Sequence, residues 1–426
     1  MRGLSLVKVL LGIGYVAVLF AVQDTVLRDW TVGVLLQAVI LNSAIIIGIY
    51  AFRGFETRTA FSVNSSFIAT AAGGLTGALV ALIPILFFIE RRIGRFAYIW
   101  TLVLVVLVFP FVTHMVMRLV VKRRPPRRFF VVGDCSDISA VLDELVDKSL
   151  DKIEIIGCTS EPDRIEKALN NSTGELVELL IVDQDTMRPI REQAEQAHTK
   201  GVTIQFLPEI VEENLSRIPL EVVKRFSDYY SVVFSYSRYS QSLRILDILI
   251  STIAIIVLSP LIFFSALYIL LKDGRPIIYS QTRHGLNGKQ FRLYKFRTMT
   301  EIKGQEDPVM TKSGKLLRAL RFNELPQFFN VIKGDMSIVG PRPDIPSTYE
   351  FCTHELPFYH YRTKIMPGLT GHAQVLFLHV DELDKEAFAE RLSYDLYYVK
   401  NYTISLYLST ILKTLETVVF GRGRAG

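Results

Sequence analysis

Cysteine and charge are both scarce in this sequence. The chain has 426 residues, of which three are cysteines and only 21% are charged. Cys135, Cys158 and Cys352 form no CxxC pair and no Cys/His grouping, which argues against a zinc site and favours a reducing compartment and a fold that needs no disulfide. The net charge of +6 comes without a basic stripe interleaved with aromatic residues, so we expect no nucleic acid partner.

Hydrophobic residues make up 50% of the chain and cluster in long uncharged runs, which excludes a disordered protein and argues against a wholly soluble one. Four runs open the chain, at residues 4–22, 31–52, 67–89 and 96–117. Each is close to the ~20 residues with which a helix crosses the hydrocarbon core. A signal peptide is the alternative for the first run, but no small-residue cleavage site follows it. We therefore expect four transmembrane helices within residues 1–121.

The basic residues around these runs predict their orientation. A dense cluster follows the fourth run and comprises Arg118, Lys122, Arg123, Arg124, Arg127 and Arg128. Basic flanks favour the cytoplasmic side, so we expect this cluster and the N-terminus to face the cytoplasm. The loop with Arg91, Arg92 and Arg95 would then face outward, against the same rule, and the larger cluster decides the prediction.

The middle of the chain, residues 122–223, alternates between short β-rich runs and amphipathic stretches. The predicted strands are 129–132, 153–158, 179–182 and 202–206, and the predicted helices are 136–148, 162–169 and 190–199. This rhythm indicates a parallel sheet of Rossmann-like type. Gly133 alone follows the first strand, so the GxGxxG motif of a dinucleotide site is missing, and a vestigial or regulatory ligand pocket stays open. We interpret residues 224–241 as a linker.

A fifth uncharged run, residues 248–271, is long enough to span a membrane. We predict instead a re-entrant helix over 245–271, because Ser259 and Pro260 lie in its middle, where proline favours a kink. Both flanks are also basic, whereas a spanning helix should show a charge asymmetry. Asp247, at the mouth of the run, is predicted to pair with a neighbouring cation such as Arg244. A kinked spanning helix is the alternative.

The C-terminal region is rich in residues that suit phosphate chemistry. The run Asn323-Glu324-Leu325-Pro326 predicts a helix start, with Asn323 as its cap and exposed N–H groups as a phosphate site. Arg283, Lys295, Arg297 and Arg342 are the candidate phosphate ligands. Glu324, with Asp335 or Asp344 if folding brings either close, could bind Mg²⁺. Each residue has an ordinary structural explanation by itself, but together they favour phosphate chemistry.

An ordered series of motifs carries a resemblance to a known family. The motifs are the Ser-Pro helix, YKFRTM at 294–299, ELPQ at 324–327, NVIKGDMSIVGPRP at 330–343, PGLTGHAQV at 367–375 and YDLYYVKN at 394–401. Residues 242–424 closely resemble the bacterial polyprenyl-phosphate sugar-1-phosphate transferases, the monotopic phosphoglycosyl transferases. The preceding spans and Rossmann-like domain are similar to those of its large members. The resemblance implies a mainly helical, monotopic catalytic domain over 242–426, with a re-entrant helix.

The resemblance also implies an activity and its partners. A nucleoside-diphosphate sugar, expected to be a UDP-sugar, would bind with Mg²⁺ and give its sugar phosphate to undecaprenyl phosphate, releasing the nucleoside monophosphate. The product would start an exopolysaccharide, O-antigen or capsule chain. The expected location is the bacterial inner membrane, with the catalytic domain at the cytoplasmic face of the bilayer. The resemblance leaves a homodimer open.

Two positions depart from the family pattern. Asn323 stands where the family carries its nucleophilic Asp, beside Glu324, and these two are the expected catalytic and metal-binding positions. A carboxamide is a poor nucleophile and a weaker Mg²⁺ ligand than a carboxylate. The chain could be an engineered variant, a natural variant in which Glu324 acts instead or transfer is direct, or a non-catalytic scaffold of a polysaccharide assembly complex. His372 replaces a family Trp, which leaves contacts near the membrane or sugar open. A nucleotide-sugar dehydratase is disfavoured because the glycine fingerprint is missing.

Overall fold

In the computed structural model, the chain divides into two compact units, Met1–Ile210 and Val211–Gly426, here the N-terminal and the C-terminal unit. The residues that the structure describes are 2–26, 30–60, 63–88, 95–123, 125–149, 151–161, 177–185, 195, 198–199, 201–300, 309–377 and 384–419.

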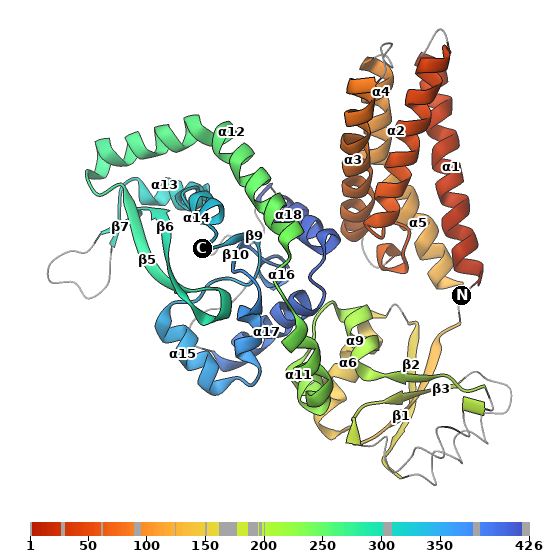
Figure 1. Ribbon diagram of the computed structural model, residues 1–426. Helices are drawn as coiled ribbons and strands as arrows, with labels where there is room; N and C mark the ends of the chain where they lie inside the picture. Colours follow the sequence, from red (N-terminus) through yellow and green to blue (C-terminus); the bar gives the residue numbers. More distant parts are fainter. Residues whose placement is uncertain are drawn as a thin grey trace. The chain divides into compact units, whose positions relative to one another are not determined.

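The N-terminal unit begins with four long helical rods (Figure 1). Three are the α-helices α1 (Arg2–Val26), α2 (Val32–Ala51) and α3 (Val63–Phe88). The fourth runs without a break through α4 (Arg95–Val103), the π-helical turn η2 (Leu104–Val108) and α5 (Phe109–Lys122). By length and composition, Leu6–Val26, Val32–Ala51 and Phe96–Lys122 could each cross a membrane, and the described apolar stretch of α3 is the shorter Ser66–Leu82. The four predicted helices are therefore confirmed as helices.

These rods pack as membrane helices do, through small residues and buried polar pairs. A Cβ atom on Gly48, Gly73 or Gly77 would collide with the backbone of the facing helix, so only glycine lets α2 and α3 approach this closely. Gln23 donates hydrogen bonds to Asn42 (3.0 Å) and to Thr101 (3.1 Å), and all three side chains are buried. Polar groups inside an apolar bundle are satisfied in this way by one another.

The same unit ends in a four-stranded parallel sheet. Its strands are β1 (Arg127–Val132), β2 (Ile153–Thr159), β3 (Val177–Ile181) and β4 (Ile204–Phe206), in the order β2-β1-β3-β4. A short 3₁₀ turn, η3 (Ser136–Ile138), and helix α6 (Ser139–Lys148) follow β1. All four predicted strands, their parallel pairing and the first predicted helix are confirmed. The predicted helix 162–169 and most of 190–199 lie outside the described residues.

The prediction that the fold needs no disulfide is wrong for this sheet. Cys135, just after β1, is bonded to Cys158 near the end of β2, while Cys352 is free and buried. The parallel register places Cys158 opposite Val131, so the two thiols meet at the carboxyl edge of the sheet although 23 residues separate them. Sequence spacing alone could not reveal this pairing, because it arises only from strand register.

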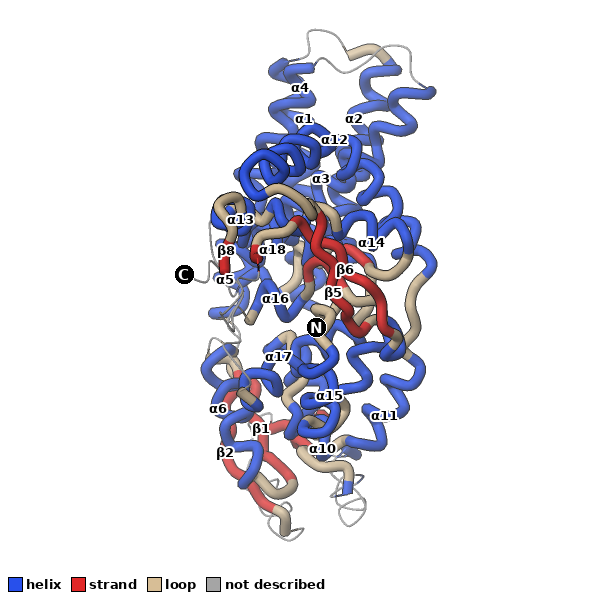
Figure 2. Tube along the Cα trace, turned by 90° about the vertical axis from the view of Figure 1, so that its left-hand side faces the viewer, coloured by secondary structure: helices blue, strands red, loops and turns tan. Residues whose placement is uncertain are grey.

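The C-terminal unit is mainly helical, as predicted, with few and short strands (Figure 2). Its largest strand pair is the antiparallel hairpin of β5 (Ile278–His284) and β6 (Gln290–Phe296), joined through η5 (Leu286–Gly288). Two further pairs are β7 (Met299–Thr300) with β8 (Val309–Met310), and β9 (Ser337–Val339) parallel to β10 (Gly368–Thr370). The helices are α10 (Leu220–Arg225), α11 (Ser227–Tyr236), α12 (Gln241–Asp273), α13 (Gly314–Ala319), α14 (Gln327–Lys333), α15 (Pro346–Glu355), α16 (His372–Leu376), α17 (Lys385–Lys400) and α18 (Ile404–Val419), with the 3₁₀ turns η6 (Phe322–Glu324) and η7 (Tyr359–Lys364). Helix α9 (Leu207–Leu215) crosses the division between the units.

Helix α12 bends but does not break (Figure 1). Pro260 lies inside it and has no N–H to offer to the carbonyl of Ile256, four residues earlier. The hydroxyl of Ser259 donates to that same carbonyl at 2.8 Å. The Ser-Pro pair therefore removes one helical hydrogen bond and supplies a substitute, which lets an apolar helix bend without leaving a carbonyl unsatisfied.

The predicted ion pair between Asp247 and Arg244 is wrong. Asp247 is fully buried and accepts hydrogen bonds from four neutral donors: the hydroxyls of Tyr239, Ser337 and Tyr407 and the backbone N–H of Ile338. Arg244 instead donates to the carbonyls of Val331 (2.6 Å) and Ile332 (2.8 Å) near the C-terminus of α14. A cation at a helix C-terminus meets the unpaired carbonyls there, so each residue fastens the start of α12 separately.

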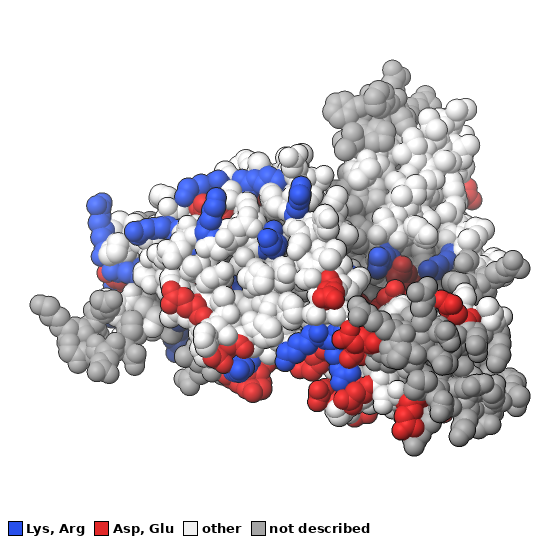
Figure 3. All heavy atoms as spheres, turned by 60° about the horizontal axis from the view of Figure 1, so that its bottom comes forward, with Lys and Arg blue, Asp and Glu red and all other residues white. Residues whose placement is uncertain are grey.

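Charge is unevenly distributed over the surface (Figure 3). The helical rods of the N-terminal unit show almost no charged atoms on the face in view. On the C-terminal unit, Lys and Arg side chains gather toward the upper edge of that view, and Asp and Glu side chains lie mostly below them. The uncharged face agrees with helices that lie in lipid.

Candidate active site

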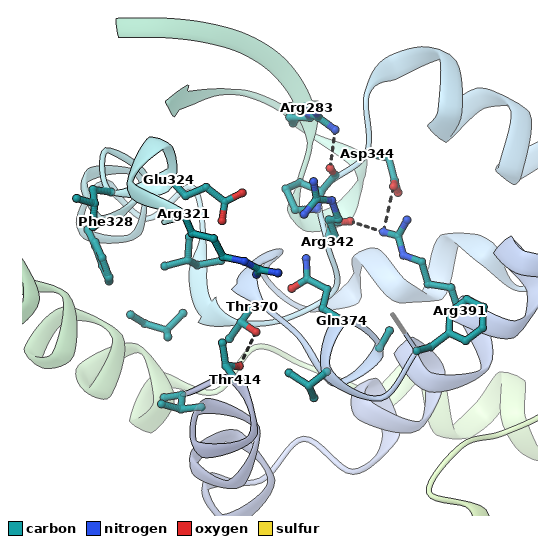
Figure 4. Close-up of a pocket in the computed structure, with 18 of the residues that line it drawn as sticks. Arg283, Arg321, Glu324, Phe328, Arg342, Asp344, Thr370, Gln374, Arg391 and Thr414 are labelled. Atoms are coloured by element: carbon teal, nitrogen blue, oxygen red, sulfur yellow. Dashed lines mark hydrogen bonds and ion pairs between the residues drawn. The ribbon is translucent and has the colours of Figure 1, made fainter. Parts of the chain in front are cut away.

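The C-terminal unit contains a cavity of about 720 Å³ that joins a charged end to an apolar end (Figure 4). Its charged lining includes Arg283, Arg321, Glu324, Arg342 and Arg391. Its apolar lining includes Ile250 and Ala254 from α12, Phe328 from α14 and Ile411 from α18. Parts of the chain more than 150 residues apart therefore build one site.

The charged end brings together residues of β5, β6 and η6 and of the loop that follows β9. Arg283 is on β5, Arg342 follows β9, and Lys295 on β6 lies 3.6 Å from the carboxylate of Glu324 on η6. A smaller pocket, which shares Arg283, Glu324 and Arg342 with the cavity, is lined by Lys295 as well. The structure thus gathers three of the four predicted phosphate ligands around Glu324.

Asn330 of α14 explains why Lys295 and Glu324 meet. Its side-chain oxygen accepts a hydrogen bond from the N–H of Tyr294 (3.0 Å), and its amide group donates to the carbonyl of Arg292 (2.7 Å). The buried amide of Asn330 thus joins α14 to β6 by forming two hydrogen bonds with the backbone of the strand. Because η6 directly precedes α14, this link places Glu324 beside Lys295.

Desolvation and mutual repulsion mark the charged end as a site for anions. Burial is the larger and the nearby charge of Arg342 the smaller cause that together lower the pKa of Arg283 to about 10. Burial also lowers the pKa of Lys295, against the attraction of Glu324. Arg342 keeps solvent access through the cavity, but surrounding protein desolvates it and lowers its pKa as well. An anionic ligand would relieve this cost by restoring the lost solvation.

The net charge of this end is positive. Four cations, Arg283, Lys295, Arg321 and Arg342, face one carboxylate, Glu324, which leaves a formal excess of three positive charges. Arg391 does not add to the excess, because it is paired with Asp344 at 3.2 Å. The arrangement suits a ligand with two phosphate groups.

The local structure around Asn323 differs from the prediction. Asn323 does not cap a helix: it lies inside η6, and α14 begins only at Gln327, with Pro326 at its N-cap position and no side-chain cap. The left-handed backbone of Arg321 (φ 57°) starts η6 and turns the chain there. Among the described residues, Glu324 lines the cavity and Asn323, half-buried beside it, does not.

Two other predicted residues, Arg297 and His372, have different positions. Arg297 donates to the carbonyls of Asp273 (2.6 Å), Gly274 (3.1 Å) and Arg275 (3.1 Å), so the structure uses it to cap the end of α12. His372 is buried, contacts the carbonyl of Ser216 at 3.0 Å through Nε2 and stacks on Tyr397. Its role in the structure is therefore in packing.

The two carboxylates considered with Glu324 as metal ligands have partners of their own. Asp335 is paired with Lys333 at 3.0 Å, and Asp344, which lines the cavity, is held by Arg362 and Arg391. No group of three or more His, Cys, Asp or Glu side chains that could hold a metal occurs in the described part of the chain.

Sequence reasoning missed three lining residues. Arg391 lies on α17, 49 residues after Arg342 and outside the recognised motifs, so no local signal marks it. Gln374 lies within the motif at 367–375 and Arg321 lies three residues before ELPQ, but nothing in the sequence shows that they face the same cavity as Arg342 (Figure 4).

Comparison with known proteins places this site in a family. The profile described as bacterial sugar transferase matches residues 238–421, which include every residue of the cavity. The chain is 33% identical over 186 residues to an uncharacterized sugar transferase, EpsL, of Bacillus subtilis, and the match covers 88% of that protein and 42% of this chain. The chain belongs to the bacterial sugar transferase family.

Two relatives with named substrates are longer than the matched region. The UDP-N-acetylgalactosamine-undecaprenyl-phosphate N-acetylgalactosaminephosphotransferase of Aeromonas hydrophila is 39% identical over 188 residues, 42% of this chain and 44% of that protein. The UDP-glucose:undecaprenyl-phosphate glucose-1-phosphate transferase of Klebsiella pneumoniae is 36% identical over 180 residues, 40% of this chain and 39% of that protein. The chain thus spans less than half the length of these two bacterial sugar transferases.

Proposed function

We propose that this chain carries the site of a sugar-1-phosphate transferase. Its donor would be a nucleoside-diphosphate sugar, most simply a UDP-sugar as in the names of the relatives, and its acceptor undecaprenyl phosphate. The product, a polyprenyl-diphosphate sugar, would begin an exopolysaccharide, O-antigen or capsule chain at the inner membrane. One observation carries the proposal: a single cavity joins a cationic end to an apolar wall supplied by the membrane-type helix α12.

The two ends of the cavity match the two substrates. The excess of positive charge around Arg283, Lys295 and Arg342 suits the diphosphate of an activated sugar, and guanidinium groups bind phosphate oxygens in pairs. Ile250, Ala254 and Ile411 offer apolar contact to a polyprenyl chain next to its phosphate. Both phosphates could therefore approach each other near Glu324.

The reaction exchanges one phosphorus–oxygen bond for another. The bond between the sugar-bearing phosphorus and the bridging oxygen breaks, and the nucleoside monophosphate leaves with that oxygen. In the route that the family resemblance implies, a carboxylate at position 323 first bonds to this phosphorus, and an oxygen of the lipid phosphate then displaces it. Asn323 is neutral and cannot take this part, so the covalent route requires Asp there. The binding groups remain in place around Glu324.

The site offers Mg²⁺ one carboxylate, that of Glu324, which already lies close to Lys295. Mg²⁺ is commonly held by one or two carboxylates with substrate phosphates and water completing its shell. Glu324, with Asn323 beside it, would hold the ion, which would neutralise charge on the diphosphate. The carboxylate already lies 3.6 Å from Lys295, so this side chain would have to be shared between Lys295 and the ion.

We also infer that α12 enters and leaves the bilayer on the same side, although its length would allow it to span. Its first half is fixed to β9 through Asp247, and its second half packs through Ile269 on Phe296 and Leu317 of the same unit. A crossing helix would need folded protein on both sides of the membrane to make both contacts. Between them, near the bend, exposed apolar side chains offer a face to lipid: Ile253, Ile256, Val257, Phe263 and Phe264.

The test is turnover by the full chain and its Asn323→Asp variant in detergent with undecaprenyl phosphate and Mg²⁺, across a panel of nucleotide sugars. We expect the variant to release more than one equivalent of nucleoside monophosphate per chain only when the lipid phosphate is present, and at least tenfold faster than the parent chain, about 1.4 kcal/mol in activation free energy. Asn323→Ala is the matched control and should not gain activity. A folded Asn323→Asp variant that turns over no nucleotide sugar would refute the transferase proposal.

The neutral side chain of Asn323 favours one second candidate, a non-catalytic scaffold or regulator of a polysaccharide assembly complex. This candidate predicts that both the parent chain and Asn323→Asp bind nucleotide sugar without turnover. The same experiment, with binding measured alongside product release, separates the two functions.

A further inference from the structure

Hydrogen bonds to its backbone carbonyls fix the loop Gly340–Asp344, which carries Arg342. Four consecutive carbonyls, from Pro341 to Asp344, each accept a hydrogen bond from outside the loop. The donors, in order, are the N–H of Gly368 (3.0 Å), the guanidinium groups of Arg362 (2.9 Å) and Arg391 (3.1 Å), the guanidinium of Arg283 (3.1 Å) and the N–H of His284 (2.9 Å). The two prolines also fix their own φ angles, so little freedom remains in the loop.

The side chain of Arg342 contrasts with its backbone. Within the described residues, no protein atom forms a hydrogen bond or ion pair with its guanidinium group, and the side chain lines both the cavity and the smaller pocket. A cation on a rigid backbone with a free head group is suited to a ligand, because little freedom is lost on binding.

Arg362 is the centre of the network behind this loop. Its side chain is 3% exposed, and it contacts Asp395 of α17 at 2.8 Å and Asp344 of the loop itself. The hydroxyl of Tyr359 donates to Asp344 at 2.7 Å, and a third arm of the Arg362 guanidinium reaches the carbonyl of Arg342. Arg362 does not line the main cavity, so it has no direct route to a ligand there.

The network is also electrically balanced. Arg362 and Arg391 face Asp344 and Asp395, two cations against two carboxylates, so the network adds no net charge to the cavity. Buried arginine–carboxylate groups of this kind are weak sources of stability, but they favour one arrangement over others. What this one fixes is the position of the Arg342 carbonyl.

We propose that Arg362 is a positioning residue that holds the Arg342 guanidinium against a bound diphosphate by fixing the carbonyl of Arg342 from behind. This rests on the proposed function only in that the ligand contains a diphosphate group. It predicts that a change at Arg362 weakens diphosphate binding through Arg342 and by no other path. Asp395 acts with it, because it orients Arg362.

The experiment is a double-mutant cycle in the full chain with inorganic pyrophosphate and Mg²⁺ as the probe, read by calorimetric titration. The variants are Arg342→Ala, Arg362→Lys and their combination. Lysine keeps the buried charge but cannot reach Asp344, Asp395 and the carbonyl of Arg342 together. We expect Arg362→Lys to weaken pyrophosphate binding by roughly fivefold or more when Arg342 is present and by less than about twofold when it is alanine.

A second variant and a control guard against a purely structural effect. Asp395→Asn is nearly isosteric, and its effect should disappear in the same way in the Arg342→Ala background. Arg217→Lys changes a comparable arginine, paired with Glu390 on α17 at 2.7 Å, and should leave pyrophosphate binding unchanged in both backgrounds. Melting temperatures of all variants are measured in parallel.

The outcomes separate this proposal from the proposed function. Equal losses with and without Arg342 would overturn the positioning role. A parent chain that does not bind pyrophosphate would overturn both the positioning role and the diphosphate site. Coupled losses, found together with an Asn323→Asp variant that turns over no substrate, would support the positioning of Arg342 and refute only the transferase.

Discussion

Substitution by lysine should have opposite effects on stability and on diphosphate binding at Arg297 and Arg342, although the sequence predicts both as phosphate ligands. Arg297 and Arg342 both lie in motifs of the C-terminal region and are both predicted phosphate ligands, yet Arg297 caps α12 while Arg342 lines the cavity. We therefore expect Arg342→Lys to weaken diphosphate binding with little change in stability. Arg297→Lys should lower stability and leave diphosphate binding nearly unchanged.

The contacts set the magnitudes. A lysine at 342 keeps the charge but loses the paired hydrogen bonds of a guanidinium, and one charged hydrogen bond is worth roughly 1.5–3 kcal/mol, or about 10- to 150-fold in affinity. Arg297 makes three hydrogen bonds to carbonyls at the end of α12, of which lysine could keep one. At the same 1.5–3 kcal/mol for each of the two charged bonds lost, the variant should be destabilised by roughly 3–6 kcal/mol, which lowers Tm by roughly 10 °C in a domain of this size.

The assay is pyrophosphate titration and thermal unfolding of the two variants, each in the full chain and the same detergent. Lysine in both places makes each variant the control for the other, because charge and residue type are matched. The reasoning would be refuted if Arg297→Lys lost pyrophosphate affinity as strongly as Arg342→Lys at an unchanged Tm. Arg297 would then contact the ligand directly, and the capping contacts would be incidental.

Two further predictions follow from the charges of the C-terminal unit. The pKa of Arg283 is lowered from 12.5 to about 10, and an anion binds only the protonated side chain. Pyrophosphate affinity should therefore fall above pH 10 by up to about tenfold per pH unit. An affinity that does not change up to pH 11 would contradict this prediction. Asp247→Ala should leave four buried donors without an acceptor and destabilise the unit by several kcal/mol, while Asp247→Asn keeps an acceptor and should cost less; equal melting temperatures for the two variants would contradict the four-donor arrangement.

The sequence was a good guide wherever a local pattern fixes a local structure. Hydrophobic runs predicted the four membrane-type helices, and alternating strand and helix patterns predicted the four parallel strands. The candidate phosphate ligands Arg283, Lys295 and Arg342 could be selected by residue type, and the structure brings them together around Glu324. Residue type narrows the choice because charged side chains that bind phosphate are mostly arginine and lysine, but the same criterion also selected Arg297, which caps α12 instead.

The sequence failed where a residue has two plausible partners and only the tertiary structure decides between them. Asp247 was predicted to pair with Arg244, three residues away on the same helix, but neutral donors from β9 and α18 surround it. Asparagine is a residue type that often caps helices, so Asn323 was predicted to cap one. The left-handed turn at Arg321 instead places Asn323 in a 3₁₀ turn that ends before α14 begins. Both predictions judged a contact by distance along the chain.

The back of the site depends on residues that lie before the family segment. The family profile begins at residue 238, yet Glu212, Ser216 and Ile218 of the same unit contact α16 and α17. Glu212 forms an ion pair with Lys400 at 2.6 Å, and the N–H of Ile218 donates to the carbonyl of Ser393 at 3.0 Å. The carbonyl oxygen of Ser216 lies 3.0 Å from Nε2 of His372. Helix α17 carries Arg391 and Asp395, the two side chains that hold Arg342 and Arg362. Helix α17 therefore contacts the candidate phosphate ligand Arg342 and its neighbour Arg362 within the family segment, and Glu212 and Ile218 before it.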